Sequence, residues 1–107
     1  MKDESVLLAR MVDSAEKILR ATQGKSEQEF GDVETTPAAV VLWLTQIGEI
    51  AKRLREDTKS RYALPWKDII GFRDMAVHEY FELSLADVYL TATKDIPELV
   101  RVLKGGA

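Results

Sequence analysis

The stretch TPAAVVLWLTQIGEIAKRL, residues 36–54, decides the fold. Its apolar residues recur every three or four positions, which is the period of one face of an α-helix. Thr36 is a good N-cap and Pro37 suits a first helical turn, so we expect a helix from there to about Asp57. Gly48 costs a helix interior about 1 kcal/mol relative to alanine. A close crossing with another helix would explain its presence.

The same helical period continues on both sides of this stretch. A first helix should end near Gly24, and residues 26–29 have the form of a capping box that begins a short helical turn. Pro65 is placed to open a third main helix, and Ser84 to cap the last one. Pro97 should kink or break that last helix, because proline lacks the N–H that a helix uses and clashes with the preceding turn.

No strand pattern, repeat or low-complexity linker interrupts these segments. A length of 107 residues suits one domain. We therefore expect an all-α fold, an antiparallel bundle of four to five helices formed by residues 1–107 as a single domain.

The composition excludes several classes of function. There is no cysteine, which rules out disulfides and thiolate metal sites, and a single histidine is too few for an ordinary zinc site in one chain. No signal peptide and no run of apolar residues long enough to span a bilayer is present, so we expect a cytoplasmic location and no membrane partner. The net charge of −3 argues against binding nucleic acid by bulk electrostatics. Any RNA binding must come from a local basic patch, a partner chain or a small site.

The segment RDMAVHEY, residues 73–80, holds the residue types that RNA cleavage needs. Arg73 offers a fixed fork of donors suited to phosphate. Histidine as a residue type can take or give a proton near neutral pH, which makes His78 a candidate acid or base in the transition state. A base that activates the 2′-hydroxyl and a cation that stabilises the developing phosphorane charge are sufficient without a metal ion.

The spacing within this segment predicts a site shared between two chains. Asp74 and His78 are four residues apart, so on a helix the carboxylate could orient the imidazole. Arg73 and His78 are five apart, roughly 140° around an ideal helix. One helix therefore spreads these groups along a ridge, and a second copy across a two-fold axis would close the cleft. We accordingly expect a homodimer.

A plainer interpretation stays open. A lone histidine near a helix end is more often a surface or capping residue than a catalyst. The plainer interpretation is favoured even more for Tyr80, which is then an amphipathic ring at the edge of a core.

The pattern Arg73-x4-His78-x-Tyr80 resembles the signature of the HEPN superfamily, in its HepT-like toxin branch. The flanking sequences are similar as well. PWKDIIGF at residues 65–72 resembles the lead-in to the motif, IGEIAKRL at 47–54 the preceding helix, and DIPEL at 95–99 the final helix. The resemblance covers about residues 5–104.

This resemblance implies a metal-independent ribonuclease that acts as a homodimer and needs no cofactor. Arg73 would bind the scissile phosphate and His78 would be the acid and base. Asp74 stands where the family commonly has a polar residue, often asparagine, and would have a supporting role. The substrate would be RNA, with tRNA as one candidate.

The resemblance also implies a partner protein. Members of this branch are paired with an MntA-like nucleotidyltransferase antitoxin, which transfers AMP to the tyrosine of the motif, here Tyr80. A bulky anionic group two residues from His78 would repel an RNA phosphate and block access to the site.

Basic residues near the end of the 36–57 helix offer a candidate RNA-binding rim, consisting of Lys52, Arg53 and Arg55. The alternative is a solvated helix end whose cations complement the helix dipole. Glu56 and Asp57 dilute the charge, which favours this alternative.

Two other functions compete with the ribonuclease. The first is a non-catalytic subunit of a nucleotidyltransferase that binds nucleotide or presents substrate. It predicts tight association with a transferase and no RNA cleavage. The second is an interaction-only helical bundle in which substituting Arg73 or His78 changes nothing.

Overall fold

The computed structural model describes residues 3–105, and within that range it is helical with no strand. This confirms the all-α class; residues 1–2 and 106–107 of the expected domain lie outside the described residues. The elements in chain order are α1 (Ser5–Thr22), α2 (Glu27–Asp32), α3 (Thr35–Arg53), α4 (Glu56–Lys59), α5 (Trp66–His78), the 3-10 turn η1 (Tyr80–Glu82), α6 (Leu85–Leu90), the π-helical turn η2 (Thr91–Asp95) and α7 (Ile96–Leu103).

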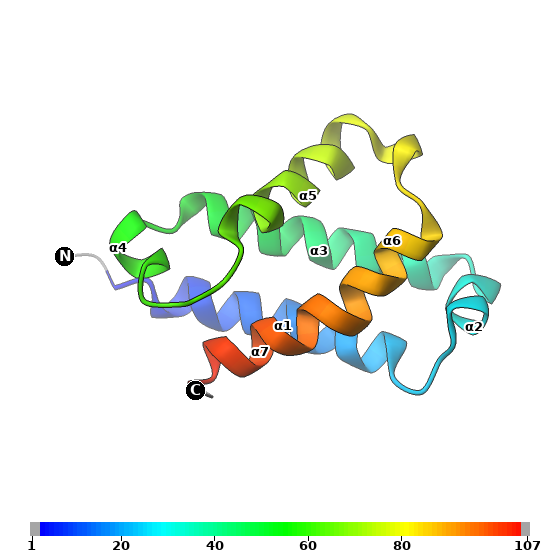
Figure 1. The fold of residues 1–107 in the computed structure, drawn as a ribbon, viewed down its shortest axis with the longest axis horizontal. Helices are drawn as coiled ribbons and strands as arrows, with labels where there is room; N and C mark the ends of the chain where they lie inside the picture. The colour runs from blue at the N-terminus through cyan, green and yellow to red at the C-terminus, as the bar shows by residue number, and fades with distance from the viewer. Residues whose placement is uncertain (1–2, 106–107) are drawn as a thin grey trace.

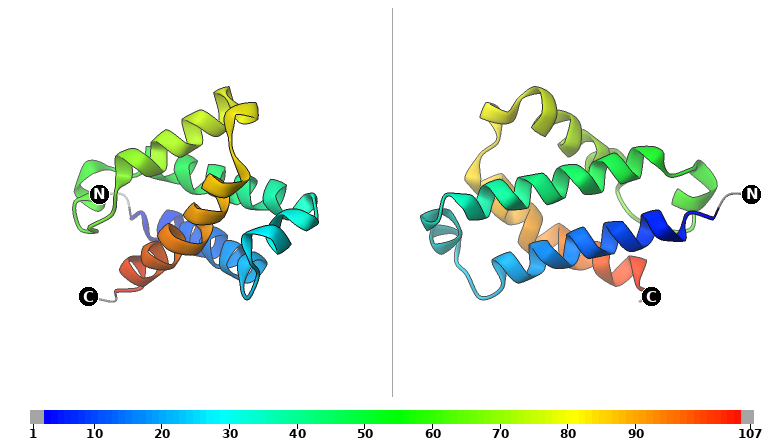
Figure 2. Two further views of the ribbon diagram at one scale, coloured as in Figure 1. Left: turned by 45° about the vertical axis from the view of Figure 1, so that its right-hand side comes forward. Right: turned by 180° about the vertical axis from the view of Figure 1, so that it is seen from behind.

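Four long helical segments alternate in direction through the bundle: α1, α3, α5 and the continuous run from α6 through η2 to α7 (Figure 1). α3 packs against both α1 and α5, and α7 packs mainly against α1. Figure 2 shows α1 and α3 side by side from behind, with α5 rising away from the α6–α7 run. α5 is thus an outer helix that depends mostly on α3 for its position.

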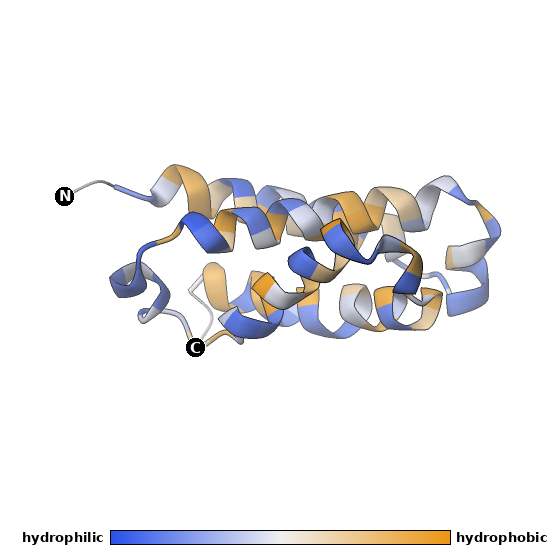
Figure 3. Ribbon diagram, turned by 90° about the horizontal axis from the view of Figure 1, so that it is seen from above, coloured by the Kyte–Doolittle hydropathy of each residue, from blue (hydrophilic) through white to orange (hydrophobic). Residues whose placement is uncertain are grey.

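The core lies where α1, α3 and α7 meet. Its apolar side chains are buried on one stripe of each helix, as the sequence period requires. They include Met11, Ala15 and Ile18 of α1, Val40, Leu44, Ile47 and Ala51 of α3, and Ile96 and Leu99 of α7. Figure 3 shows the resulting alternation of apolar and polar positions around the helices. Of the helices within residues 3–105, none is both long and apolar enough to cross a bilayer.

The predicted helix ends are partly confirmed. The Ser26 hydroxyl accepts from the Glu29 N–H at 3.1 Å, and the Glu29 carboxylate accepts from the Ser26 N–H at 2.9 Å, which is the expected capping box. Thr36 was the wrong N-cap, because α3 already begins at Thr35. The helix was also predicted too long: it ends at Arg53, since Leu54 takes an extended conformation with ψ 141°.

Pro97 neither breaks nor sharply ends the last helix. The chain widens into the π turn just before it, so that the Ile96 N–H donates to the Thr91 carbonyl five residues back. Pro97 then occupies the first turn of α7, where its missing N–H matters least. Helical structure continues through the proline at the cost of one wide turn.

Gly48 marks the predicted close crossing, and its partner is α5. A Cβ added to Gly48 would lie 2.3 Å from Arg73 Cβ and 3.1 Å from the Ile69 carbonyl oxygen. Because no side chain fits there, the bare α3 backbone lets α5 approach at the turn that carries Arg73.

Candidate active site

Arg73 is held in a fixed place between α3 and α5. Its stem lies over Gly48, and its side chain is only 19% exposed. Nε forms an ion pair with the Glu49 carboxylate of α3, and Nη1 donates to Asp74 Oδ1 at 2.9 Å. Two carboxylates and one glycine therefore orient the guanidinium before any ligand arrives.

Asp74 contacts cations and not the histidine. Besides Arg73, its Oδ1 lies 3.6 Å from Lys52 Nζ of α3. The hydrogen bond from Arg73, and next the charge of Lys52, lower the pKa of Asp74, and the same hydrogen bond raises the pKa of Arg73. Both groups are charged at neutral pH. The expected Asp74–His78 contact is not among the hydrogen bonds and ion pairs of residues 3–105.

His78 is the last residue of α5 and is exposed to solvent. Within the described part of the chain, its ring has no hydrogen bond or ion pair, and no such contact joins it to Arg73. Arg73 faces α3 while His78 stands at the free end of α5. One chain therefore presents the two groups without enclosing them.

Tyr80 lies two residues after His78, at the start of η1, and is 50% exposed. Its ring contacts the Phe81 ring edge-on, with centroids 5.7 Å apart and an interplanar angle of 86°. The tyrosine also lines a depression of about 340 Å³ formed with the start of α3 and with α6. Its position leaves it accessible to a modifying enzyme.

Comparison with known proteins decides the family. The profile of the HepT-like ribonuclease family matches residues 11–105 of the chain. This chain belongs to the HepT-like ribonuclease family. The membership confirms the enzyme class that the motif predicts, a ribonuclease, and the match spans every residue of the candidate site.

Individual relatives agree with this assignment. A protein of Caldanaerobacter subterraneus subsp. tengcongensis with the name "Putative RNase" is 31% identical over 97% of this chain and 94% of its own length. A "Putative RNase" of Methanocaldococcus jannaschii is 30% identical over 92% of this chain and 82% of its own. The "Probable ribonuclease HepT" of Thermococcus cleftensis is 29% identical over 86% and 84%. No solved structure matches the chain at a comparable level.

The three residues of the predicted basic rim of this HepT-like ribonuclease differ in whether a carboxylate compensates their charge. Lys52 pairs with Asp74. Arg55 Nε lies 3.4 Å from Asp57 and 4.0 Å from Glu4, so its charge is compensated. Arg53 is exposed, as Lys52 is, and it alone of the three has no ion pair within residues 3–105.

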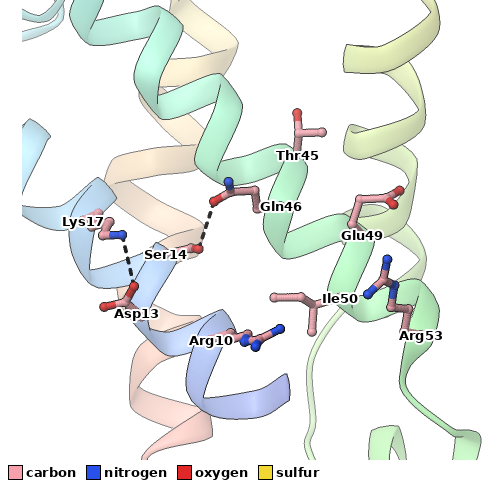
Figure 4. Close-up of a pocket in the computed structure, with 9 residues that line it drawn as sticks. All are labelled: Arg10, Asp13, Ser14, Lys17, Thr45, Gln46, Glu49, Ile50 and Arg53. Carbon is pink, nitrogen blue, oxygen red and sulfur yellow. Dashed lines mark hydrogen bonds and ion pairs between the residues drawn. The ribbon is translucent and has the colours of Figure 1, made fainter. Parts of the chain in front are cut away.

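The contact of Glu49 with Arg73 and the place of Arg10 near the site were not predicted from the sequence. Glu49 contacts Arg73 from another helix, and the signal that could have revealed this was its neighbour Gly48, since a helical glycine indicates where a second helix comes close. Arg10 lies on α1 and faces the α3 surface that carries Arg53 (Figure 4). No local pattern indicated that it belongs near the site.

The described residues offer no cluster of three or more histidine and carboxylate side chains that could hold a metal ion. They place a fixed guanidinium, that of Arg73, and an exposed imidazole, that of His78, on the same helix without a contact between them. Those groups can bind a phosphate and move a proton.

Proposed function

We propose that this HepT-like ribonuclease is the toxin of a toxin–antitoxin pair and cleaves RNA without a metal ion, with Arg73 and His78 supplied by facing copies of α5. The observation that carries the proposal is the fixed guanidinium of Arg73, held over Gly48 by Glu49 and Asp74. A donor fork oriented in advance binds a phosphate at little further entropic cost.

The chemistry follows from the two groups. The His78 imidazole removes the proton of the RNA 2′-hydroxyl, and the 2′-oxygen forms a bond to phosphorus. Arg73 stabilises the negative charge that builds on the non-bridging oxygens. The bond from phosphorus to the 5′-oxygen breaks, and the protonated His78 of the second copy donates a proton to that oxygen. The products are a 2′,3′-cyclic phosphate and a 5′-hydroxyl end.

A homodimer is supported by the surface of α5. Ala76 is the one buried residue among the thirteen of this helix. Large apolar side chains are exposed around His78: Met75 is 45% exposed, Val77 49% and Phe81 97%. Exposed apolar surface of this kind marks a protein contact. A second copy seated there would bring two His78 side chains to one interface and complete the cleft.

Control by modification is supported by the exposure of Tyr80. A nucleotidyltransferase antitoxin would join the Tyr80 oxygen to the α-phosphorus of ATP, release pyrophosphate and leave AMP on the phenol. Its added negative charge, two residues from His78, would repel the RNA backbone. Intact-mass and peptide mass spectrometry after co-expression with the transferase should find AMP on Tyr80. Modification at another residue would remove this control mechanism and leave the ribonuclease proposal standing.

The decisive experiment compares wild type, Arg73→Ala and His78→Ala on RNA in the presence of EDTA. We expect wild type to cleave, loss of His78 to lower the rate by about 10²–10⁴-fold, and loss of Arg73 by about 10²–10³-fold. Both substitutions should also end toxicity in a bacterial host. If the wild type leaves RNA intact at every dimer concentration yet binds a transferase tightly, the non-catalytic subunit is the correct interpretation.

A further inference from the structure

A groove between α1 and α3 lies beside the Arg73 site and has no role in the proposed chemistry. Its volume is about 390 Å³, within the range of ligand sites. Figure 4 shows Arg10 extending from α1 toward Ile50, and Arg53 turned toward Glu49. Glu49 thus lies on the boundary, since it lines this groove and also pairs with Arg73.

The charges in the groove are unbalanced. Both carboxylates that line it already have a cation: Asp13 lies 3.1 Å from Lys17, and Glu49 pairs with Arg73. Arg10 and Arg53 are exposed and have neither a hydrogen bond nor an ion pair within residues 3–105. Two uncompensated positive charges therefore share one groove in a chain whose net charge is −3.

The remaining lining suits a nucleic acid strand. The Ser14 hydroxyl donates to the Gln46 side-chain oxygen at 3.3 Å, which joins the two helices across the groove (Figure 4). Ile50 supplies an apolar surface next to the polar groups. Arginine forks beside an apolar wall offer contacts for both the phosphate and the base of a nucleotide.

We propose that this groove binds phosphates of the RNA strand next to the one that Arg73 holds, with Arg10 and Arg53 as the contacts. The proposal rests on the proposed function, because it needs RNA as the substrate. It supplies the local basic patch that an acidic chain requires in order to hold RNA. Because Glu49 borders both sites, the groove is adjacent to Arg73, and a strand that leaves Arg73 can reach it.

Salt dependence of binding tests the groove without catalysis. In a His78→Ala background, a labelled single-stranded oligoribonucleotide of mixed sequence is titrated at several salt concentrations. For single strands, each phosphate contact adds about −0.7 to the slope of log K against log salt, so Arg10→Gln with Arg53→Gln should make this slope less negative by about 1.4. The matched control is Arg20→Gln, which removes an exposed arginine of α1 outside the groove. It should change the slope by less.

Cleavage by the active protein gives a second readout. The double variant should raise KM by roughly tenfold or more and leave kcat unchanged, because the scissile phosphate and the proton transfer are untouched. If the double variant folds poorly, Arg53→Glu compared with Arg20→Glu tests the same charge with one substitution.

The outcomes separate the two proposals. A double variant that matches Arg20→Gln in slope and KM, in a protein that cleaves RNA, overturns the groove proposal alone. Loss of antitoxin binding with unchanged RNA binding overturns it in favour of a protein contact. Absence of RNA binding and cleavage in the wild type overturns the proposed function, and the groove proposal with it.

Discussion

Replacing Gly48 with alanine should destabilise the fold and disable the site together. The new Cβ would lie 2.3 Å from Arg73 Cβ, 3.0 Å from Arg73 Cγ and 3.1 Å from the Ile69 carbonyl oxygen, where ordinary contact starts near 3.4 Å. The nearest of these atoms, Arg73 Cβ, is attached directly to the backbone, and the Ile69 oxygen is itself a backbone atom. A change of rotamer cannot relieve the overlap, so α5 must move away from α3 by about 1 Å.

The size of the effect follows from a matched control. Gly71 also lies within a helix, but a Cβ there meets nothing within 4 Å. Both substitutions gain about 1 kcal/mol of helix propensity, so the difference between Gly48→Ala and Gly71→Ala isolates the packing cost. Overpacking of this kind costs about 1–3 kcal/mol. For a chain of this size that difference corresponds to about 4–12 °C in thermal midpoint.

Thermal unfolding and RNA cleavage together test this reasoning. Gly71→Ala should be more stable than wild type and fully active. Gly48→Ala should unfold at a lower temperature than Gly71→Ala and cleave RNA about 100-fold more slowly, because a displacement of about 1 Å is enough to spoil alignment at a reaction centre. Equal midpoints and equal activities for the two variants would refute the claim that Gly48 sets the position of Arg73.

Three further predictions address separate features. Hydrogen bonds from Thr58 and from a backbone amide lower the pKa of Glu4 below its ordinary value of 4.5, so the charged carboxylate stabilises the fold fully above pH 4.5 and loses this effect as the pH falls through the lowered pKa. In thermal melts, Glu4→Gln should therefore be less stable than wild type at pH 7 and approach wild type in acid, and a difference that stays constant with pH would contradict this. Glu49→Gln keeps an acceptor for Arg73 but removes a negative charge that faces RNA, so fluorescence anisotropy should show RNA binding tighter by roughly fivefold, and weaker binding would count against the proposed phosphate site. Phe81→Ser should weaken self-association in sedimentation experiments and leave helicity intact, because the Phe81 side chain is 97% exposed in one chain. An unchanged dissociation constant of the dimer would place the dimer contact elsewhere.

Local signals in the sequence were enough to predict much of the fold. The capping box at Ser26, the start of α5 after Pro65 and the cap at Ser84 each depend on a few neighbouring residues, and the structure has all three. Gly48 was also informative, because a glycine that costs a helix stability needs a reason in tertiary packing. The period of the apolar residues then fixed which face of each helix is buried.

Contacts between distant residues were not predictable in the same way. Asp74 was expected beside His78 from their spacing on one helix, yet α3 offers Lys52 to the same carboxylate across the interface. The pairing of Arg73 with Glu49 and the placement of Arg10 in the same groove as Arg53 likewise depend on how helices cross. Helical period gives the face on which a residue lies; it does not give the charge that another helix brings opposite.

The wide turn at residues 91–95 has a consequence for how chain length can vary in this family. Val88, Ala92, Ile96 and Leu99 are all buried, and within this run the Ile96 N–H donates to the Thr91 carbonyl five residues back, one residue more than an α-helical turn spans. The turn therefore carries one surplus residue. Deleting a single residue there should turn the segment into ordinary α-helix with both buried faces still aligned. We expect relatives that differ by a one-residue gap at this point to keep the same bundle.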